Sequence, residues 1–179
     1  MSLPWGISGR ISVLTPVSTV TEAAAAAAAG ASLVDVGGDD ELIPAIRDAT
    51  RDVRISGRGA GADIIRDAAL AARAGAGLIC PDPDAAARAV RSGITAERIL
   101  VAAAPAGIPA AVRSGWAVLV DVDEGADSPA EAEAVAAVCG WLGASVIRTR
   151  YVAGVRRCAD MTESILGSRP PAWTLRGLA

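Results

Sequence analysis

The sequence predicts an α/β fold made of repeated strand–helix units, and three observations support this prediction. Short β-branched runs alternate with Ala-rich helical stretches at intervals of roughly 20 to 25 residues, which is typical of βαβ units on a parallel sheet. Most of these runs are apolar throughout, as expected for strands that are buried on both faces. Glycine repeatedly stands between a helical stretch and the next run, where it can end a helix in the left-handed conformation.

Seven segments have the character of buried strands. In order, they are Ile11–Leu14, Ser32–Val36, Val53–Ser56, Gly77–Cys80, Ile99–Ala103, Ala117–Asp121 and Ser145–Thr149. The glycines that precede five of them are Gly30, Gly75, Gly93, Gly115 and Gly143. A bundle of Ala-rich helices would have no use for a β-branched run after each glycine, so we interpret the repeats as strand–helix units.

Helix starts are marked by polar residues in the turns that follow the strands. Thr19 or Thr21 is placed to cap the helix that contains the seven alanines at 23–29. Ser128, followed by a proline and then by Glu131 three residues later, has the pattern of a capped start for a later helix.

A glycine-rich stretch, GRGAG at residues 57–61, is expected to open the third helix. It would serve either as a flexible turn or as a source of backbone N–H groups for a phosphate. Its spacing matches neither a G-x-G-x-x-G nor a Walker A loop, which favours the flexible turn.

Seven strand–helix units are one short of the eight that close a TIM barrel. The sequence leaves two arrangements open, an incomplete or seven-stranded barrel and an open doubly wound sheet. We expect a single domain over residues 1–179, with residues 168–179 forming an extended tail after the last helix.

The composition excludes several kinds of chemistry. All 17 basic residues are Arg, and the chain contains neither Lys nor His. It therefore has no imidazole base or ligand and no Lys for a Schiff base. A metal site would need carboxylates alone, and we expect neither a metal nor a cofactor. A net charge of −3 argues against a nucleic-acid partner.

The expected location is the cytoplasm, without membrane attachment. The longest apolar run, residues 23–29, is far below the roughly 20 residues that span a bilayer. The N-terminus shows no pattern of a signal peptide. Cys80, Cys139 and Cys158 are odd in number and widely spaced, which favours reduced thiols.

Charged side chains gather at the ends of three predicted strands. Arg148 and Arg150 are two residues apart at the end of the last strand, so alternation is expected to point both to the same face. Asp35 ends the second strand, and Asp121 and Asp123 share a face at the end of the sixth. Ligand sites of α/β folds lie at the carboxyl ends of their strands, so these residues are expected to line one ligand site.

Three stretches resemble the dihydropteroate synthases. Residues 30–40, GASLVDVGGDD, are similar to the second strand of that family, typically G-A-x-I-I-D-V-G-G-E-S. Residues 143–152, GASVIRTRYV, are similar to its last strand, G-A-x-I-[IV]-R-V-H-D-V, and residues 75–90 resemble its fourth strand and helix. The resemblance implies an eight-stranded barrel, usually dimeric, that joins a pterin diphosphate to p-aminobenzoate in folate synthesis.

The family's site implies roles for individual residues, with several departures. Its pterin pocket uses an Asp on strand three, an Asn on strand four and an Asp on strand six; a Lys follows strand seven, and Arg and His lie on strand eight. By resemblance, Asp35 and Asp121 match Asp positions of the family's pattern, and Arg148 matches the Arg of its last strand. Ser56 stands at the Asp of strand three, Cys80 at the Asn of strand four and Arg150 at the His. The family's S-R-K segment has no evident counterpart, which we expect to account for the missing eighth unit.

Three hypotheses about function follow. The first is a degenerate, shortened dihydropteroate-synthase-like protein without ordinary synthase activity, which binds a pterin, a phosphate-type anion or a partner protein. The second is an enzyme with altered chemistry on a pterin or phosphorylated substrate, with Asp121 as acid or base. The third is a homodimeric scaffold with Trp141 as an anchor, although Trp141 could equally be a core residue. The expected ligand-binding residues are Asp35, Ser56, Cys80, Asp121, Arg148 and Arg150.

Overall fold

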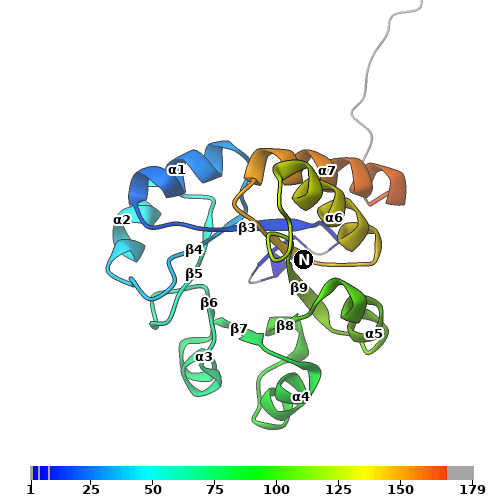
Figure 1. The fold of residues 1–179 in the computed structure, drawn as a ribbon. Helices are drawn as coiled ribbons and strands as arrows, with labels where there is room; N and C mark the ends of the chain where they lie inside the picture. Colours follow the sequence, from blue (N-terminus) through cyan, green and yellow to red (C-terminus); the bar gives the residue numbers. More distant parts are fainter. Residues whose placement is uncertain (1, 4, 8, 169–179) are drawn as a thin grey trace, which may run out of the picture.

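The chain folds into a closed barrel of eight parallel strands surrounded by helices, as seen in a computed structural model that describes residues 2–3, 5–7 and 9–168 (Figure 1). The barrel strands, in spatial order from the closing strand, are β10 (Val146–Arg148), β3 (Ser12–Pro16), β4 (Leu33–Asp35), β5 (Arg54–Ser56), β6 (Ile64–Ile65), β7 (Gly77–Cys80), β8 (Ile99–Ala102) and β9 (Ala117–Asp121). The TIM-barrel type of fold is therefore confirmed, and the open sheet is excluded.

The predicted count of seven strands is wrong, because the sequence pattern concealed one of them. All seven predicted segments form strands, with bounds that differ by at most two residues at either end. The eighth is β6, which has only two residues and pairs with β5 through Ser56 and Ile64. Such a short run has too few residues to show a period. The strand that the prediction lacked therefore lies between the third and fourth predicted strands, and not after the sixth, where we expected the gap.

Seven α-helices pack around the barrel within the described residues. They are α1 (Val20–Ala28), α2 (Leu42–Ala49), α3 (Ala68–Ala74), α4 (Pro83–Arg91), α5 (Ile108–Arg113), α6 (Pro129–Trp141) and α7 (Val152–Leu166), with 3₁₀ turns at Ala96–Arg98 and Pro105–Gly107. The predicted caps are confirmed for α1, where Thr19 accepts from Glu22 N, and for α6, where Ser128 accepts from Glu131 N.

No helix connects β5 to β6, and the GRGAG stretch lies in that connection rather than at a helix start. The third helix, α3, begins later, with Asp67 as its N-cap. The carboxylate of Asp40 is held by this loop, because Arg58 N donates to its Oδ1 at 2.9 Å. A Cβ at Gly57 would lie 2.5 Å from the same oxygen, so glycine permits the close approach. The N–H of Arg58 is therefore already bonded to the Asp40 carboxylate, and a phosphate in this loop would have to compete with that carboxylate for it.

Apolar side chains from the strands fill the barrel interior, and one tryptophan closes it. The interior cluster consists of Trp5, Leu14, Leu33, Ile64, Ile79, Leu100, Leu119 and Val146. Trp5 is 2% exposed and lies between the two short strands of an antiparallel hairpin, β1 (Ser2–Leu3) and β2 (Gly6–Ile7). The hairpin therefore places an aromatic side chain in the barrel core at the amino ends of its strands.

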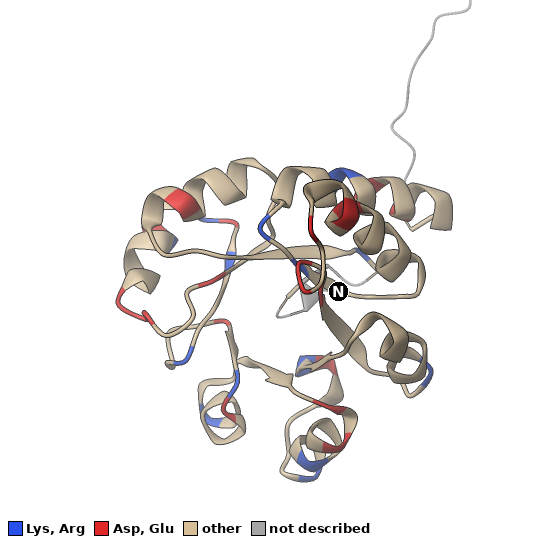
Figure 2. Ribbon diagram, viewed as in Figure 1, with Lys and Arg blue, Asp and Glu red and all other residues tan. Residues whose placement is uncertain are grey.

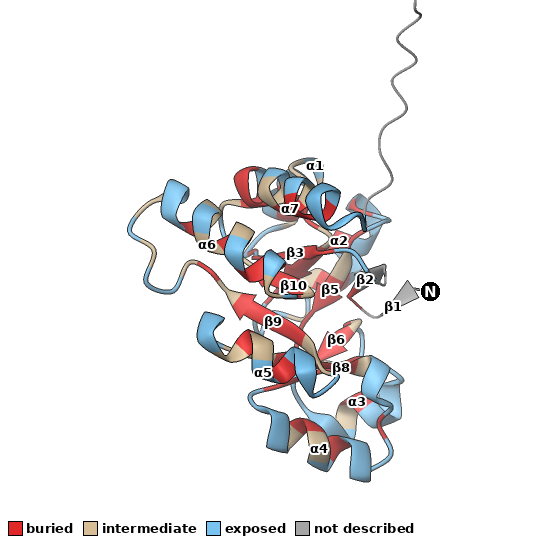
Figure 3. Cartoon of the chain, turned by 90° about the vertical axis from the view of Figure 1, so that its right-hand side faces the viewer, coloured by how far each residue is buried: buried red, intermediate tan, exposed pale blue. Residues whose placement is uncertain are grey.

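A second, larger cluster lies between the outer face of the barrel and the helices. In Figure 3 the barrel strands are mostly buried, whereas the helices are exposed over much of their surface. The last helix, α7, is joined to the start of the barrel by Glu163, which is 1% exposed and accepts from Ile11 N at 2.6 Å. Of the predicted tail, Ser168 is described, and 169–179 lie outside the described residues.

Within the part of the chain that the structure describes, no helix is both long enough and apolar enough to cross a bilayer.

Candidate functional site

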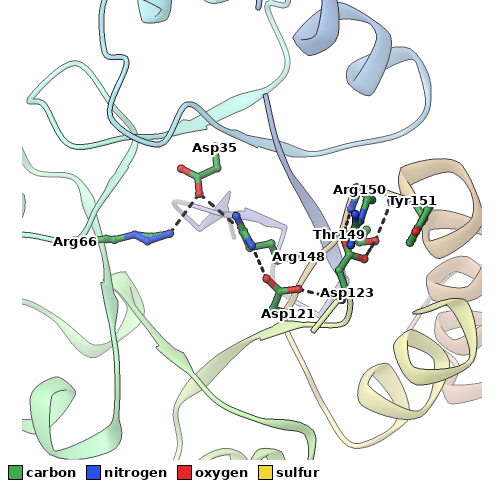
Figure 4. Close-up of polar contacts among 8 residues, drawn as sticks. All are labelled: Asp35, Arg66, Asp121, Asp123, Arg148, Thr149, Arg150 and Tyr151. Atoms are coloured by element: carbon green, nitrogen blue, oxygen red, sulfur yellow. Dashed lines mark hydrogen bonds and ion pairs between the residues drawn. The ribbon is translucent and has the colours of Figure 1, made fainter. Parts of the chain in front are cut away.

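Alternation along the strands brings four charged residues together at the carboxyl end of the barrel. Each stands two positions after an interior core residue and points inward as that residue does. Three of them are the last residue of their strand, and the fourth directly follows β6. The four are Asp35, after Leu33; Arg66, after Ile64; Asp121, after Leu119; and Arg148, after Val146. We call this group of four the mouth. Figure 4 shows that their side chains converge, with Arg148 between the two carboxylates.

Asp35 is the buried centre of the mouth, 6% exposed. Its Oδ1 accepts from Gly37 N at 3.1 Å, in the turn after β4. Its Oδ2 accepts from Arg66 Nη2 at 3.3 Å and lies 3.9 Å from Arg148 Nε. Two guanidinium groups thus flank one carboxylate oxygen, an arrangement that compensates the cost of burying its charge.

Arg148 links Asp35 to the opposite wall of the barrel. Its Nη1 donates to Asp121 Oδ2, and the pairing of β10 with β9 sets Arg148 beside Asp121. Asp121 Oδ1 accepts from Asp123 N at 3.0 Å. The Nε of Arg148 is buried without a hydrogen-bond partner among the described residues. The result is an alternating chain of charges, Arg66–Asp35–Arg148–Asp121, across the mouth.

Arg150 and Asp123 form a separate group, so the prediction that Arg148 and Arg150 point the same way is wrong. The strand β10 ends at Arg148, and its alternation does not extend to Arg150. Asp123 Oδ2 accepts from Arg150 N at 2.7 Å, and Asp123 Oδ1 accepts from Thr149 Oγ1 at 2.7 Å. Arg150 is 63% exposed, and its guanidinium lies 5.4 Å from the centre of the Tyr151 ring. Figure 4 shows this group to one side of the mouth.

Cys80 does not reach the mouth, which corrects its prediction as a ligand-binding residue. Its neighbour Ile79 belongs to the interior cluster, so Cys80 points outward and packs between the barrel and the helices. Burial raises the pKa of the Cys80 thiol, and the charge of Asp82 raises it further. The thiol is therefore protonated at neutral pH and behaves as a small apolar side chain.

Ser56 lies next to the mouth. It is 1% exposed and is paired with Asp35 across β4 and β5. On the other side, a cavity of about 450 Å³ opens beside Asp121 and is lined by Ala102, Pro105 and Leu119 among others. Small alanine side chains leave this space open.

Charge is balanced among the four residues of the mouth. In Figure 2, acidic and basic residues are intermixed around the ring of strands and helices. No group of His, Cys, Asp and Glu suited to a metal ion occurs in the described part of the chain. The four mouth residues comprise two cations and two anions. A ligand would therefore be recognised by the placement of hydrogen-bond donors and acceptors rather than by a net charge of the mouth.

Similarity to known proteins is found in part of the sequence and in the fold. No family model matches it. Two curated relatives, both called inactive dihydropteroate synthase 2, from Mycobacterium tuberculosis and Mycobacterium bovis, are 33% identical over 122 residues, which cover 53% of this chain and 37% of each relative. The chain therefore matches well under half the length of these relatives.

Solved structures extend the similarity to the whole barrel. Rv1207 of Mycobacterium tuberculosis superposes with a TM-score of 0.76 at 27% identity, over 96% of this chain and 99% of the other. The dihydropteroate synthase of Yersinia pestis gives 0.72 at 18% identity, over 88% and 93%. A synthase from Coxiella burnetii, solved with pteroic acid, gives 0.72 at 16% identity, over 87% and 93%. Because the identity in the last two comparisons is only 18% and 16%, they show that the fold is shared and nothing more.

Counting strands in the barrel moves two of the predicted residues one place along. Cys80 ends the fifth strand and Asp121 the seventh, because β6 adds a strand before both of them. The fourth strand, β6, is followed by Arg66, and the sixth, β8, ends at Ala102. Sequence reasoning missed Arg66 because it missed β6. The signal that would have found it is the Ile64-Ile65-Arg66 run, which begins seven residues after the GRGAG stretch starts.

Proposed function

Because the chain is a shortened and degenerate member of the dihydropteroate-synthase-like family, we propose that it has lost ordinary synthase activity and acts as a binding protein through the mouth of its barrel. The ligand is a phosphate-type anion or a pterin. The expected reduced cysteines fit a cytoplasmic protein.

The observation that supports the loss of synthase activity most strongly is the replacement of polar residues on three strands. Where the resemblance places an Asp, an Asn and a His of the family, this chain has Ser56, Cys80 and Arg150. The loss cannot be repaired from elsewhere in the chain, because the sequence contains no Asn, no Lys and no His. A site that recognises a polar heterocycle through buried hydrogen bonds loses discrimination steeply when those partners are removed.

A synthase assay tests this part of the proposal. Pterin diphosphate and p-aminobenzoate are incubated with the protein, and both pyrophosphate release and dihydropteroate are measured beside an active synthase as a positive control. We expect no product above a protein-free blank. Turnover that disappears in the Asp121→Ala variant would refute the proposal and would favour an enzyme that uses Asp121 as acid or base.

Ligand binding at the mouth is supported by the surplus of guanidinium donors there. Arg148 is two-thirds buried, and guanidinium groups suit phosphate and carboxylate. A ligand at about 100 times its dissociation constant stabilises the protein by roughly 2.7 kcal/mol, which corresponds to about 5–10 °C in melting temperature for a chain of this size. We expect such a shift with pyrophosphate or pterin and its loss in Arg148→Ala. Arg113→Ala, which removes an exposed arginine in the last turn of α5, is the charge-matched control.

A second proposal is that the protein forms a homodimer through α6 and α7. Five apolar side chains on these helices are between 48% and 63% exposed, namely Val138, Trp141, Met161, Ile165 and Leu166. Trp141 is therefore not a core residue, and aromatic residues often anchor interfaces. Light scattering after size exclusion is expected to give twice the chain mass for the wild type and the chain mass for Trp141→Asp. A monomeric wild type would refute this proposal.

A further inference from the structure

Resting on the proposed function, we propose that Arg66 selects the class of ligand that the mouth accepts. Its guanidinium already donates a hydrogen bond to the Asp35 carboxylate, in the place of a donor from a ligand. The mouth then binds acceptor-rich anions, such as phosphate, pyrophosphate or a carboxylate, and rejects planar heterocycles that present an amidine-like edge of N–H donors.

The first step is that both oxygens of Asp35 already have donors. Oδ1 is held by Gly37 N at 3.1 Å, and Oδ2 by Arg66 at 3.3 Å, with the buried Arg148 Nε 3.9 Å away. A pterin-like ring bears adjacent N–H groups that match a carboxylate in the same way as a guanidinium does. Arg66 therefore makes the contact that such a ring would make with Asp35, and a ring that binds this carboxylate must displace it.

The second step is that the carboxylates of the mouth have no oxygen left without a donor. Asp121 Oδ1 accepts from Asp123 N and Asp121 Oδ2 from Arg148, as both oxygens of Asp35 do from their own partners. Each carboxylate oxygen keeps a second lone pair, so the two carboxylates could accept about four more hydrogen bonds, whereas the two arginines could donate about eight more. A guanidinium has five donors, and among the described residues the Arg66 guanidinium makes one hydrogen bond. The ligand that completes such a site is rich in acceptors.

The third step is that Arg66 is accessible. Its side chain is 51% exposed, against 7% for Asp35 and 33% for Arg148. Figure 4 shows Arg66 reaching Asp35 from the side opposite Arg148. An anion that enters from solvent can therefore contact Arg66 without first breaking its ion pair with Asp35, whereas a heterocycle has to break that pair.

The test compares two probes, inorganic pyrophosphate and pterin, by titration calorimetry on the full chain. The variants are Arg66→Ala, Arg66→Gln, Arg148→Ala and the control Arg113→Ala, each checked for folding by circular dichroism. Arg66→Gln retains most of the side chain without its charge, so it provides a second reading if Arg66→Ala is poorly folded. We expect Arg66→Ala to weaken pyrophosphate binding about 10- to 100-fold, the loss of a charge-assisted hydrogen bond. Pterin binding is expected to strengthen at least about tenfold.

The outcomes separate this inference from the proposed function. If Arg148→Ala abolishes pyrophosphate binding while Arg66→Ala leaves it unchanged, the mouth binds anions and the role of Arg66 is refuted. If pterin binds the wild type as tightly as Arg66→Ala, the exclusion of heterocycles is refuted. If neither the wild type nor any variant binds either probe, binding at the mouth fails, and the inference fails with it.

Discussion

Replacement of Glu163 is expected to destabilise the protein more than any other single change of a surface or helix carboxylate. Glu163 lies on α7, is 1% exposed and accepts three hydrogen bonds. The donors are Ile11 N at 2.6 Å, Arg10 Nε at 3.2 Å and Arg156 Nη2 at 3.2 Å. One carboxylate therefore joins the last helix to the first strand of the barrel.

The magnitude follows from what Glu163→Ala leaves behind. The N–H of Ile11 loses its partner, and Arg156, whose side chain is 15% exposed, loses one of its carboxylates. Removing one member of a buried ion pair costs about 3–5 kcal/mol, which includes an unsatisfied buried donor. For a chain of this size, this cost lowers the melting temperature by roughly 6–20 °C. Glu163→Gln retains an acceptor for Ile11 but not the charge, so we expect an intermediate loss.

Urea unfolding followed by circular dichroism measures both changes, and Glu97→Ala is the matched control. Glu97 is exposed in the 3₁₀ turn before β8, and substitution of an exposed residue usually alters stability by less than about 0.5 kcal/mol. A loss for Glu163→Ala no greater than that for Glu97→Ala would refute the reasoning, because the connection between α7 and β3 would then contribute nothing in solution.

Three further changes have defined outcomes. Trp5→Ala is expected to cost about 3–5 kcal/mol in urea unfolding, because it empties the buried end of the barrel interior; an unchanged midpoint would mean that the hairpin does not pack there. Thr19→Ala is expected to cost about 1 kcal/mol through the lost cap on α1, and Thr21→Ala, an exposed neighbour, much less. Burial raises the pKa of Cys80 and Cys139, so the folded protein retains these thiol protons at a pH where the unfolded chain loses them. The free energy of unfolding should therefore fall as the pH rises above about 8.5, and less steeply in the Cys80→Ala/Cys139→Ala double variant; equal slopes would contradict this linkage.

Strands were predictable from the sequence where they are long and bounded by glycine. Gly77–Cys80 and Ala117–Asp121 match their predicted bounds, because apolar β-branched runs of four or five residues differ clearly from the Ala-rich helices beside them. By contrast, β6 consists of Ile64 and Ile65 alone. Its position in the barrel is set by pairing with β5 and β7, which is a tertiary effect that no local pattern records.

The candidate site was predictable in part. Asp35, Asp121 and Arg148 were identified because each is the last or the second-last residue of a predicted strand, and the barrel brings their side chains together. Arg66 was missed with its strand. Arg150 was placed wrongly because alternation was extended beyond the last residue of β10, whereas hydrogen bonds to Asp123 turn the chain toward α7.

Closure of the ring has a consequence for how the protein is made. The first and last strands of the barrel, β3 and β10, are direct neighbours, with Val13 paired to Ile147. During synthesis β3 emerges early, and its outer edge has no partner until β10 follows at residues 146–148. Contacts of such large sequence separation form slowly, and unpaired strand edges favour aggregation in the meantime. A chain that is truncated after α6 would therefore have two unpaired strand edges, on β3 and β9. Pairing of β10 with both strands closes the barrel and removes the edges at which another chain could add a strand.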